Sequence, residues 1–186
     1  EEALLSAKFG NRLLAAAKTG AYITDDKSKL DGFSDSELQA ITQKSDNGTE
    51  RFVLPLHNTT QQPALQSLTN RDSRKELFER SIRRAEQGDS ADTRDIIARI
   101  ALIRAKQAQL LGYQNYAEWN LQDQMAKTPE AVNNFLFNLV PAVTEKIATE
   151  SADIQNVINQ KGEAFKLEPY DWNFYAEQVR KARYDM

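Results

Sequence analysis

Residues 128–161, TPEAVNNFLFNLVPAVTEKIATESADIQNVINQK, decide the fold class of this chain. The stretch opens on Thr-Pro-Glu, where threonine can cap a helix, proline has its φ preset and glutamate favours the positive end of the helix dipole. Apolar residues then recur every three or four positions along one helical face: Val132, Phe135, Leu136, Leu139, Val140, Val143, Ile147, Ile154, Val157 and Ile158. We predict a long helix that begins at Thr128 and bends near Pro141, because proline cannot donate a hydrogen bond to the preceding turn.

Helical signals recur along the rest of the chain. Apolar spacing with start and stop signals predicts further helices at residues 1–19, 35–44, about 60–69, 71–87, 92–111 and 171–183, and a short aromatic element at 113–121. Two capping boxes mark helix starts: Ser34 with Glu37, and Thr59 with Gln62. Residues 22–24 and 51–54 have strand character. The sequence therefore predicts an all-α fold with one or two short strands, arranged as one helical region over residues 1–186.

The composition excludes several classes of protein. With 24 basic and 27 acidic residues the net charge is −3, which gives no general attraction to nucleic acid or to anionic lipid. No apolar run approaches about 18 residues, so we expect no membrane span, and the first residues show no secretory signal pattern. The absence of cysteine excludes disulfides and thiolate metal sites, and it is typical of a reducing compartment. We therefore expect a cytoplasmic protein.

His57 is the single histidine of the chain. It follows Pro-Leu and precedes Asn-Thr-Thr, and it could act as a general base or as a metal ligand. No second histidine, H-x-x-E spacing or Ser/His pairing accompanies it, so a solvated or hydrogen-bonded loop histidine is the favoured interpretation. We predict that this chain contains no catalytic and no metal-binding residue.

The clusters of charged residues also favour structural interpretations. The acidic pairs Asp25-Asp26, Asp92/Asp95 and Glu177/Asp185 could bind a cation, but a hard-cation loop needs several oxygens converging from a tight turn, usually with Gly, so helix capping and solvated turns explain them better. The basic residues within 71–84 alternate with acidic ones, which is typical of an exposed helix with salt bridges and not of a nucleic-acid groove.

Two aromatic groups stand at short spacing, and each could stack on a ligand. They are Tyr113, Tyr116 and Trp119, and Trp172, Phe174 and Tyr175. Aromatic stripes of this kind are more often part of a core.

Four segments resemble the thimet oligopeptidase family of zinc metallopeptidases: LLGYQNYAEW (110–119), DQMAKTPEAV (123–132), DWNFYAEQVR (171–180) and, more faintly, LPLHNTTQQP (54–63). Their order and spacing are similar to those of the bacterial peptidyl-dipeptidase branch. The resemblance covers nearly the whole chain. It implies a mostly helical peptidase of two lobes, separated by a deep channel that admits short peptides. This chain would be a multi-helix part of a lobe in such a zincin-type oligopeptidase.

The same resemblance implies where the chemistry lies. The family binds zinc through an H-E-x-x-H helix and a later glutamate, and the glutamate of that helix activates a zinc-bound water that attacks the peptide carbonyl. Its peptidyl-dipeptidases release dipeptides from peptide C-termini. A chain with one histidine cannot place two imidazoles four residues apart. The resemblance therefore implies a non-catalytic portion, with zinc and short peptide substrates bound by the parent protein.

Both ends of the chain look like cuts in a longer protein. The chain begins at Glu1 without an initiator methionine and stops at Met186, directly after a helical pattern. We then expect the chain either to self-associate through apolar side chains near its ends or to leave those side chains bare. The candidates are Leu4, Leu5, Phe9, Phe174 and Val179.

A helical interaction or scaffold module with no enzymatic activity is the alternative hypothesis, and it explains the lack of an active site equally well. The gene beyond Met186 distinguishes the two. An encoded H-E-x-x-H motif supports the peptidase, whereas a stop codon without such a motif supports the module.

Overall fold

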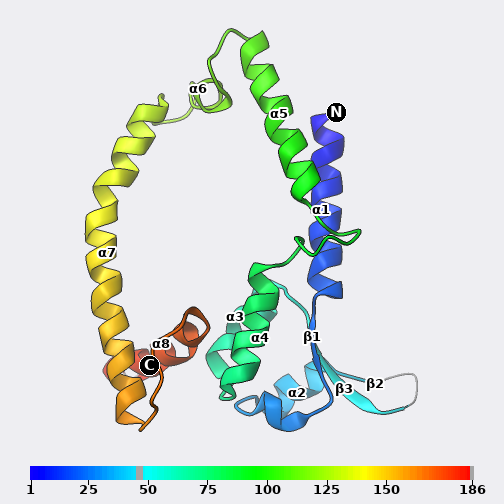
Figure 1. Ribbon diagram of the computed structural model, residues 1–186, viewed down its shortest axis with the longest axis vertical. Helices are drawn as coiled ribbons and strands as arrows, with labels where there is room; N and C mark the ends of the chain where they lie inside the picture. The colour runs from blue at the N-terminus through cyan, green and yellow to red at the C-terminus, as the bar shows by residue number, and fades with distance from the viewer. Residues whose placement is uncertain (45–47, 185–186) are drawn as a thin grey trace. The chain divides into compact units, whose positions relative to one another are not determined.

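The computed structural model describes residues 1–44 and 48–184, and the chain forms two compact units. Unit 1 comprises Glu1–Asn11 and Thr93–Glu150, and unit 2 comprises Arg12–Asp92 and Ser151–Met186. Each unit is thus assembled from two separate parts of the sequence. Helices α1 (Glu2–Thr19) and α7 (Pro129–Gln160) each contribute residues to both units (Figure 1).

Helices make up most of the described chain. In chain order the remaining elements are β1 (Tyr22–Thr24), the 3₁₀ helix η1 (Lys27–Leu30), α2 (Asp35–Ile41), β2 (Thr42–Lys44), β3 (Glu50–Leu54), α3 (Asn58–Ser67), α4 (Arg71–Ile82), α5 (Arg94–Leu110), α6 (Tyr116–Asn120), the 3₁₀ helix η2 (Pro169–Asp171) and α8 (Trp172–Tyr184). The strands have only three, three and five residues, so the predicted all-α class is confirmed. None of the described helices combines the length and the apolar character that a membrane span needs.

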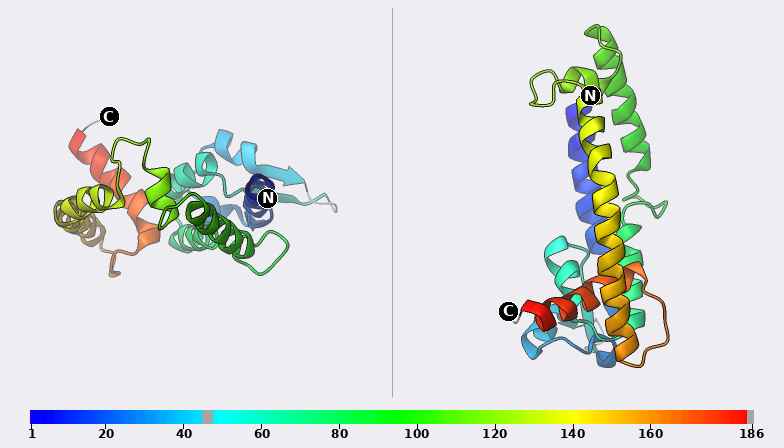
Figure 2. Two further views of the ribbon diagram at one scale, coloured as in Figure 1. Left: turned by 90° about the horizontal axis from the view of Figure 1, so that it is seen from above. Right: turned by 90° about the vertical axis from the view of Figure 1, so that its left-hand side faces the viewer.

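Helix α7 confirms the prediction made from its first residues. It has 32 residues, and the hydroxyl of Thr128 accepts a hydrogen bond from the backbone N–H of Ala131 at 3.2 Å, which satisfies a donor that the helix start leaves free. The helix continues through Pro141, and it is a single unbroken element in Figures 1 and 2. A bend at the proline stays a prediction.

Unit 2 contains a three-stranded antiparallel sheet with the order β1-β3-β2. Two of the strands were predicted, but β2 was not, because residues 35–44 were expected to form one helix. That helix has the predicted Ser34 capping box but ends at Ile41. Thr42 then pairs with Phe52 of β3. β-branched residues such as Thr42 favour extended backbone when a partner strand is present. Tertiary pairing therefore overrides the local helical signal.

The core of unit 2 lies where this sheet meets α3 and α4. Its fully buried members include residues of β1, β3, α3 and α4 and of the segments that directly follow β3 and α3: Tyr22, Leu54, Leu56, Leu65, Leu68 and Leu77. The hydroxyl of Tyr22 contacts that of Ser73 at 3.2 Å, so its polar end has a partner inside the core.

Three predicted helix boundaries in unit 2 or at its edge are wrong. Helix α3 begins at Asn58 with His57 at the N-cap, two residues earlier than a Thr59 cap would give. Helix α4 ends at Ile82, and the next residues form a tight turn in which Ala85 has a φ of 63° and is buried beside Ala16. Because this turn is buried against α1, the helix ends before Gln87, although the charged helical pattern of the sequence continues to that residue.

Helix α5 begins at Arg94, two residues after the predicted cap Asp92. The carboxylate of Asp92 instead accepts a hydrogen bond from the backbone N–H of Gly88 at 2.8 Å, so it stabilises the preceding turn. Within unit 1, two ion pairs join the first residues of α1 to α5: Glu1 with Arg99 at 2.6 Å, and Glu2 with Arg104 at 2.7 Å.

Candidate functional site

His57 lies at the N-cap of α3, where its backbone carbonyl accepts hydrogen bonds from the N–H groups of Thr60 and Gln61. Its imidazole is exposed and makes no capping hydrogen bond. Within the described residues, no group of three or more His, Cys, Asp and Glu side chains gathers closely enough to hold a metal ion. The donors around His57 therefore do not fit the zinc ion that the resemblance implies for the parent protein.

The acidic pairs serve as structural acceptors. Asp26 caps the 3₁₀ helix η1, and its carboxylate accepts from the hydroxyl and the backbone N–H of Ser28 at 2.7 and 2.9 Å. These hydrogen bonds lower the pKa of Asp26. With Asp92 bonded to the turn at Gly88, two of the three acidic pairs contain a residue that stabilises local backbone, and Asp185 of the third pair lies outside the described residues.

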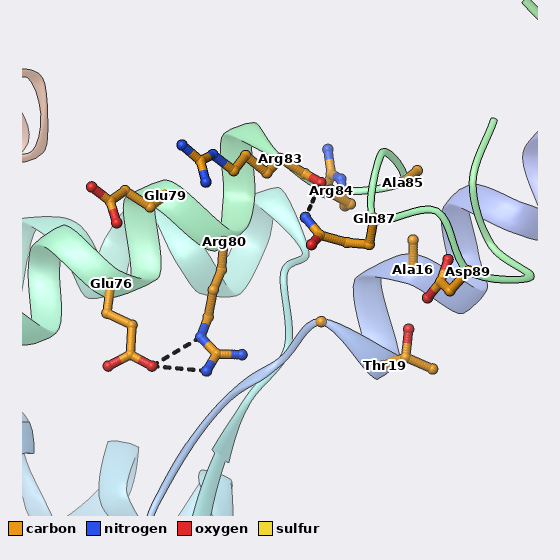
Figure 3. A pocket seen from close by; sticks show the side chains of 11 residues that line it. Ala16, Thr19, Glu76, Glu79, Arg80, Arg83, Arg84, Ala85, Gln87 and Asp89 are labelled. Atoms are coloured by element: carbon orange, nitrogen blue, oxygen red, sulfur yellow. Dashed lines mark hydrogen bonds and ion pairs between the residues drawn. The ribbon is translucent and has the colours of Figure 1, made fainter. Parts of the chain in front are cut away.

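A surface cleft of about 440 Å³ lies in unit 2, between the end of α1, α4 and the turn that follows α4 (Figure 3). It is lined by Ala16, Thr19, Gly20, Glu76, Glu79, Arg80, Arg83, Arg84, Ala85, Gln87 and Asp89. Its three arginines face three carboxylates, so the lining carries no net formal charge. A charge-balanced lining favours neither an anionic nor a cationic ligand.

The polar groups of this cleft are engaged with each other and with the backbone. Arg80 donates two hydrogen bonds to one carboxylate oxygen of Glu76, at 2.8 and 3.0 Å, as their four-residue spacing allows (Figure 3). Arg84 donates to the carbonyl of Leu56, which joins the turn after α4 to the segment that follows β3. The residues that line the cleft include no cysteine, serine or histidine, so they form no Ser/His or Cys/His pair.

Two fully buried charges of unit 2, Arg74 of α4 and Asp171 at the end of η2, form with the partly buried Arg71 of α4 what we call the clamp. The guanidinium of Arg71 binds the Asp171 carboxylate with two nitrogens, at 2.9 Å from Nη2 and 3.1 Å from Nε. Arg74 donates from Nη2 to the same carboxylate at 3.1 Å, and from Nη1 to the carbonyls of Leu68 and Thr69 at 2.9 Å each. One carboxylate thereby joins two turns of α4 to the start of α8.

Burial makes the clamp unusual. The side chains of Arg74 and Asp171 are 1% and 0% exposed, and that of Arg71 is 33% exposed. Aromatic rings enclose the guanidinium groups, with Arg71 3.8 Å from the ring centre of Phe165 and Arg74 4.3 Å from that of Phe174. The hydrogen bonds from Arg71 to Asp171 raise the pKa of Arg71 further. This is the geometry of a structural support, because no exposed face is left on which a ligand could bind Asp171 or Arg74.

Sequence reasoning missed the clamp. It treated Arg71 and Arg74 as members of an exposed, salt-bridged helix, whereas Arg74 is buried and Arg71 is half-buried. Two arginines one turn apart next to an apolar residue, Leu77, and an acid inside an aromatic run, such as Asp171, are the signals that could have suggested it.

The second aromatic group, Trp172, Phe174 and Tyr175, belongs mostly to a core, as expected from the sequence. Tyr175 is buried between Phe165 and Phe174, with ring centres at 6.2 and 5.0 Å, and burial raises the pKa of its phenol. It packs against Ile154 and Ile158 on the second half of α7.

Unit 1 has an apolar groove of about 500 Å³ between α1, α5 and α6. It is lined by Ser6, Phe9, Ile97, Ile100, Ala101, Arg104 and Tyr116. Arg104 closes one side, since its guanidinium binds Glu2 and lies 4.9 Å from the ring centre of Tyr116. The groove can accommodate apolar side chains, but its lining shows no pair of groups for proton transfer.

The first half of α7 carries a second apolar surface, which we call the α7 apolar face: Phe135, Leu136, Leu139, Val140, Val143 and Ile147. These side chains are between 44% and 64% exposed. The α7 apolar face has more exposed side chains than the set that was expected to be bare near the chain ends. Of that set, Leu4 is 75% exposed, whereas Leu5, Phe9, Phe174 and Val179 are half-buried.

Comparison with known proteins matches residues 64–186 to Peptidase family M3. Dipeptidyl carboxypeptidase of Escherichia coli (strain K12) is 45% identical over 188 residues, which cover 100% of this chain and 28% of that protein. Dipeptidyl carboxypeptidase of Salmonella typhimurium (strain LT2) is 46% identical over 186 residues, covering 99% of this chain and 27% of that protein. Probable cytosolic oligopeptidase A of Arabidopsis thaliana is 31% identical over 192 residues, covering 98% of this chain and 27% of that protein.

The matches extend over nearly all of this chain, and they confirm the resemblance drawn from its four segments. The chain spans little more than a quarter of the length of these relatives. The family match covers well over half of the chain, from the middle of α3 to the end of α8. The chain belongs to Peptidase family M3.

Proposed function

We propose that this chain is a non-catalytic helical portion of a zinc metallopeptidase that hydrolyses short peptides and releases dipeptides from their C-termini. The similarity to two bacterial dipeptidyl carboxypeptidases at 45% and 46% identity is the observation that carries the proposal. The chain contributes scaffold, because its polar groups serve helix caps, surface ion pairs and the clamp, and none forms a nucleophile–base or metal-ligand set in the described residues.

The zinc ion of the parent is proposed to lie outside this chain. One histidine and no cysteine cannot supply the two imidazoles of an H-E-x-x-H helix. When bound in the parent, such an ion polarises the peptide carbonyl and activates a water molecule. The described residues of this chain would hold the fold around that site and would not coordinate the ion.

The purified 186-residue chain tests both parts of the proposal. Its zinc content after dialysis is measured by inductively coupled plasma mass spectrometry, and its action on short peptides by mass spectrometry of the products. We expect no stoichiometric zinc and no dipeptide release. Zinc that is bound tightly by the chain and lost on His57→Ala, or dipeptides released by the chain alone, would overturn the assignment.

A cytoplasmic location and weak self-association of the isolated chain are further parts of the proposal. The lack of cysteine supports the location. The α7 apolar face and Leu4 support the self-association, because exposed apolar side chains in a row favour contact between molecules. Sedimentation velocity over a range of concentrations tests the association. A monomer at every concentration contradicts it.

A helical interaction module is the alternative, and the α7 apolar face is the observation that favours it, since such a module would recruit a partner through such a surface. Sequencing the gene beyond Met186 separates the two hypotheses. The peptidase requires an encoded H-E-x-x-H, and the module requires that none follows.

A further inference from the structure

The first half of α7 is a helix without cover. Every residue from Asn133 to Thr149 is exposed, and Figure 1 shows no other helix of unit 1 packed along this stretch. Helices in globular proteins gain most of their stability by packing an apolar face, and isolated helices are marginal in water. A face of six large apolar side chains on an uncovered helix therefore needs an occupant.

The pattern of α7 shows which of its sides is meant to be covered. At 100° per residue, the six residues of the α7 apolar face fall within an arc of about 140°. Phe137 lies outside this arc, although it is also exposed, at 69%. The opposite side of the same stretch is polar, with Asn134, Asn138 and Glu145. One side is built for packing and the other for water.

The same arc continues into the second half of α7, where it is already covered. Ile154 and Ile158 follow Ile147 at helical spacing, and they are 2% and 0% exposed because they pack on α8 around Tyr175. The apolar face is thus one continuous stripe that is buried by a helix at one end and bare at the other. The occupant of the bare end is expected to be of the same kind, an apolar-faced helix.

The size of the face argues for an occupant in the same polypeptide. Residues 135–147 span about 20 Å of helix axis and a helix is about 10 Å wide, so the face has a projected area on the order of 200 Å². A stable interface between separate proteins buries about 800 Å² on each partner. A segment of the same polypeptide avoids most of the entropic cost of association, so it can use a face this small.

We propose that the α7 apolar face packs against an apolar-faced helix from the part of the parent peptidase that lies outside this chain. The inference rests on the proposed function, and the relatives have the required length, since nearly three quarters of the Escherichia coli protein lies outside the matched region. A second copy of this chain can bind to the same face, but more weakly than a helix of the same polypeptide.

Hydroxyl-radical footprinting with mass spectrometry tests this packing in two proteins: the 186-residue chain, and the full-length polypeptide after its dipeptide release has been demonstrated. We expect oxidation of Phe135 to be several-fold slower in the full-length protein. Phe137 is the internal control, because it is the same residue type two positions away and lies outside the arc. Its oxidation rate should stay nearly the same.

Equal oxidation of Phe135 in the two proteins would overturn the inference, as would protection that appears in the 186-residue chain with rising concentration and increases no further in the full-length protein. The latter outcome would assign the face to a second copy. A full-length product without an H-E-x-x-H motif or without activity would instead defeat the proposed function, so the two failures are distinguishable.

A pair of variants adds a thermodynamic readout. Leu139→Gln changes the face, and Asn138→Gln changes the neighbouring polar side. In the full-length protein we expect Leu139→Gln to lower the thermal midpoint clearly and Asn138→Gln to leave it almost unchanged. In the 186-residue chain, where Leu139 is 44% exposed, the two variants should differ little. A full-length protein that tolerates both variants equally contradicts the packing.

Discussion

Asp171→Asn removes a negative charge from a position that water does not reach, and we predict that it strongly destabilises unit 2. The Asp171 carboxylate is 0% exposed and accepts hydrogen bonds from Arg71 and Arg74. The asparagine has nearly the same shape, so the loss is mainly electrostatic. Arg74, 1% exposed, keeps its charge in the absence of a counter-ion.

The size of the expected loss in stability depends on the hydrogen bonds and solvent contact that the two guanidinium groups keep after the substitution. Removing one partner of a buried ion pair costs about 3–5 kcal/mol, because the other charge stays buried. Arg74 still donates to the carbonyls of Leu68 and Thr69, and Arg71 is exposed enough to turn toward water, which places the expected loss near the lower limit, at about 3 kcal/mol. With a urea dependence of about 2 kcal/mol per molar, the midpoint of unfolding falls by about 1.5 M.

Tryptophan fluorescence during urea unfolding can measure this change in unit 2 alone. The chain has two tryptophans, Trp119 in unit 1 and Trp172 beside Asp171, so a Trp119→Phe background leaves a single reporter next to the clamp. Asp153→Asn is the matched control. Asp153 pairs with Arg183 at 2.7 Å, but that arginine is 53% exposed, so the control should cost less than about 1 kcal/mol.

A midpoint shift for Asp171→Asn no larger than that for Asp153→Asn would refute the reasoning. The double variant Arg74→Met with Asp171→Leu adds a second check. Apolar replacement of both buried partners is often nearly neutral, so it should recover most of the stability that Asp171→Asn loses. A double variant as unstable as the single one would show that the charges themselves are not the cause.

Two further predictions concern pH and backbone geometry. The hydrogen bond from Arg180 lowers the pKa of Glu177 to about 2 from its ordinary 4.5, so the contribution of Glu177 to stability is present above pH 4.5 and is lost as the pH falls toward 2. Glu177→Gln should therefore flatten the pH dependence of the urea midpoint over that window. An unchanged pH profile would contradict this prediction. Gly32→Ala should destabilise the chain by far more than the about 1–2 kcal/mol that a left-handed alanine costs, because Gly32 has a φ of 100° and an added Cβ would lie 2.0 Å from the Ser67 carbonyl oxygen. Gly48→Ala is the control, since Gly48 has a φ of 80° and open space around an added Cβ. Equal urea midpoints for the two variants would contradict the steric argument.

The features that sequence reasoning predicted correctly are local ones. The start of α7 at Thr128 and the capping box of Ser34 with Glu37 depend on residues within one turn of each other, so the sequence contains all the relevant information. The same holds for the salt bridges expected within residues 71–84, of which the ion pair of Glu76 with Arg80 is an example. The absence of an H-E-x-x-H helix was equally plain, because a single histidine cannot supply two ligands.

The features that it missed depend on distant partners. Strand β2 exists because Thr42 pairs with Phe52, and α4 stops at Ile82 because Ala85 is buried against α1. Arg74 looked exposed because its partner Asp171 lies 97 residues away, and no helical pattern contains that distance. Helical periodicity identified the apolar face of α7, but it could not show that half of the face is left bare.

The clamp explains how unit 2 can be built from two distant parts of the sequence. Closing a loop of about 100 residues costs on the order of 4 kcal/mol of chain entropy, and each doubling of its length adds only about 0.6 kcal/mol. Arg74 and Asp171 stand on either side of the part that unit 1 contributes, 97 residues apart. Because the entropic cost grows so slowly with loop length, the packing of η2 and α8 on α4 around the clamp tolerates large changes in the length between them. The intervening part is therefore free to present the α7 apolar face without loss of the core of unit 2.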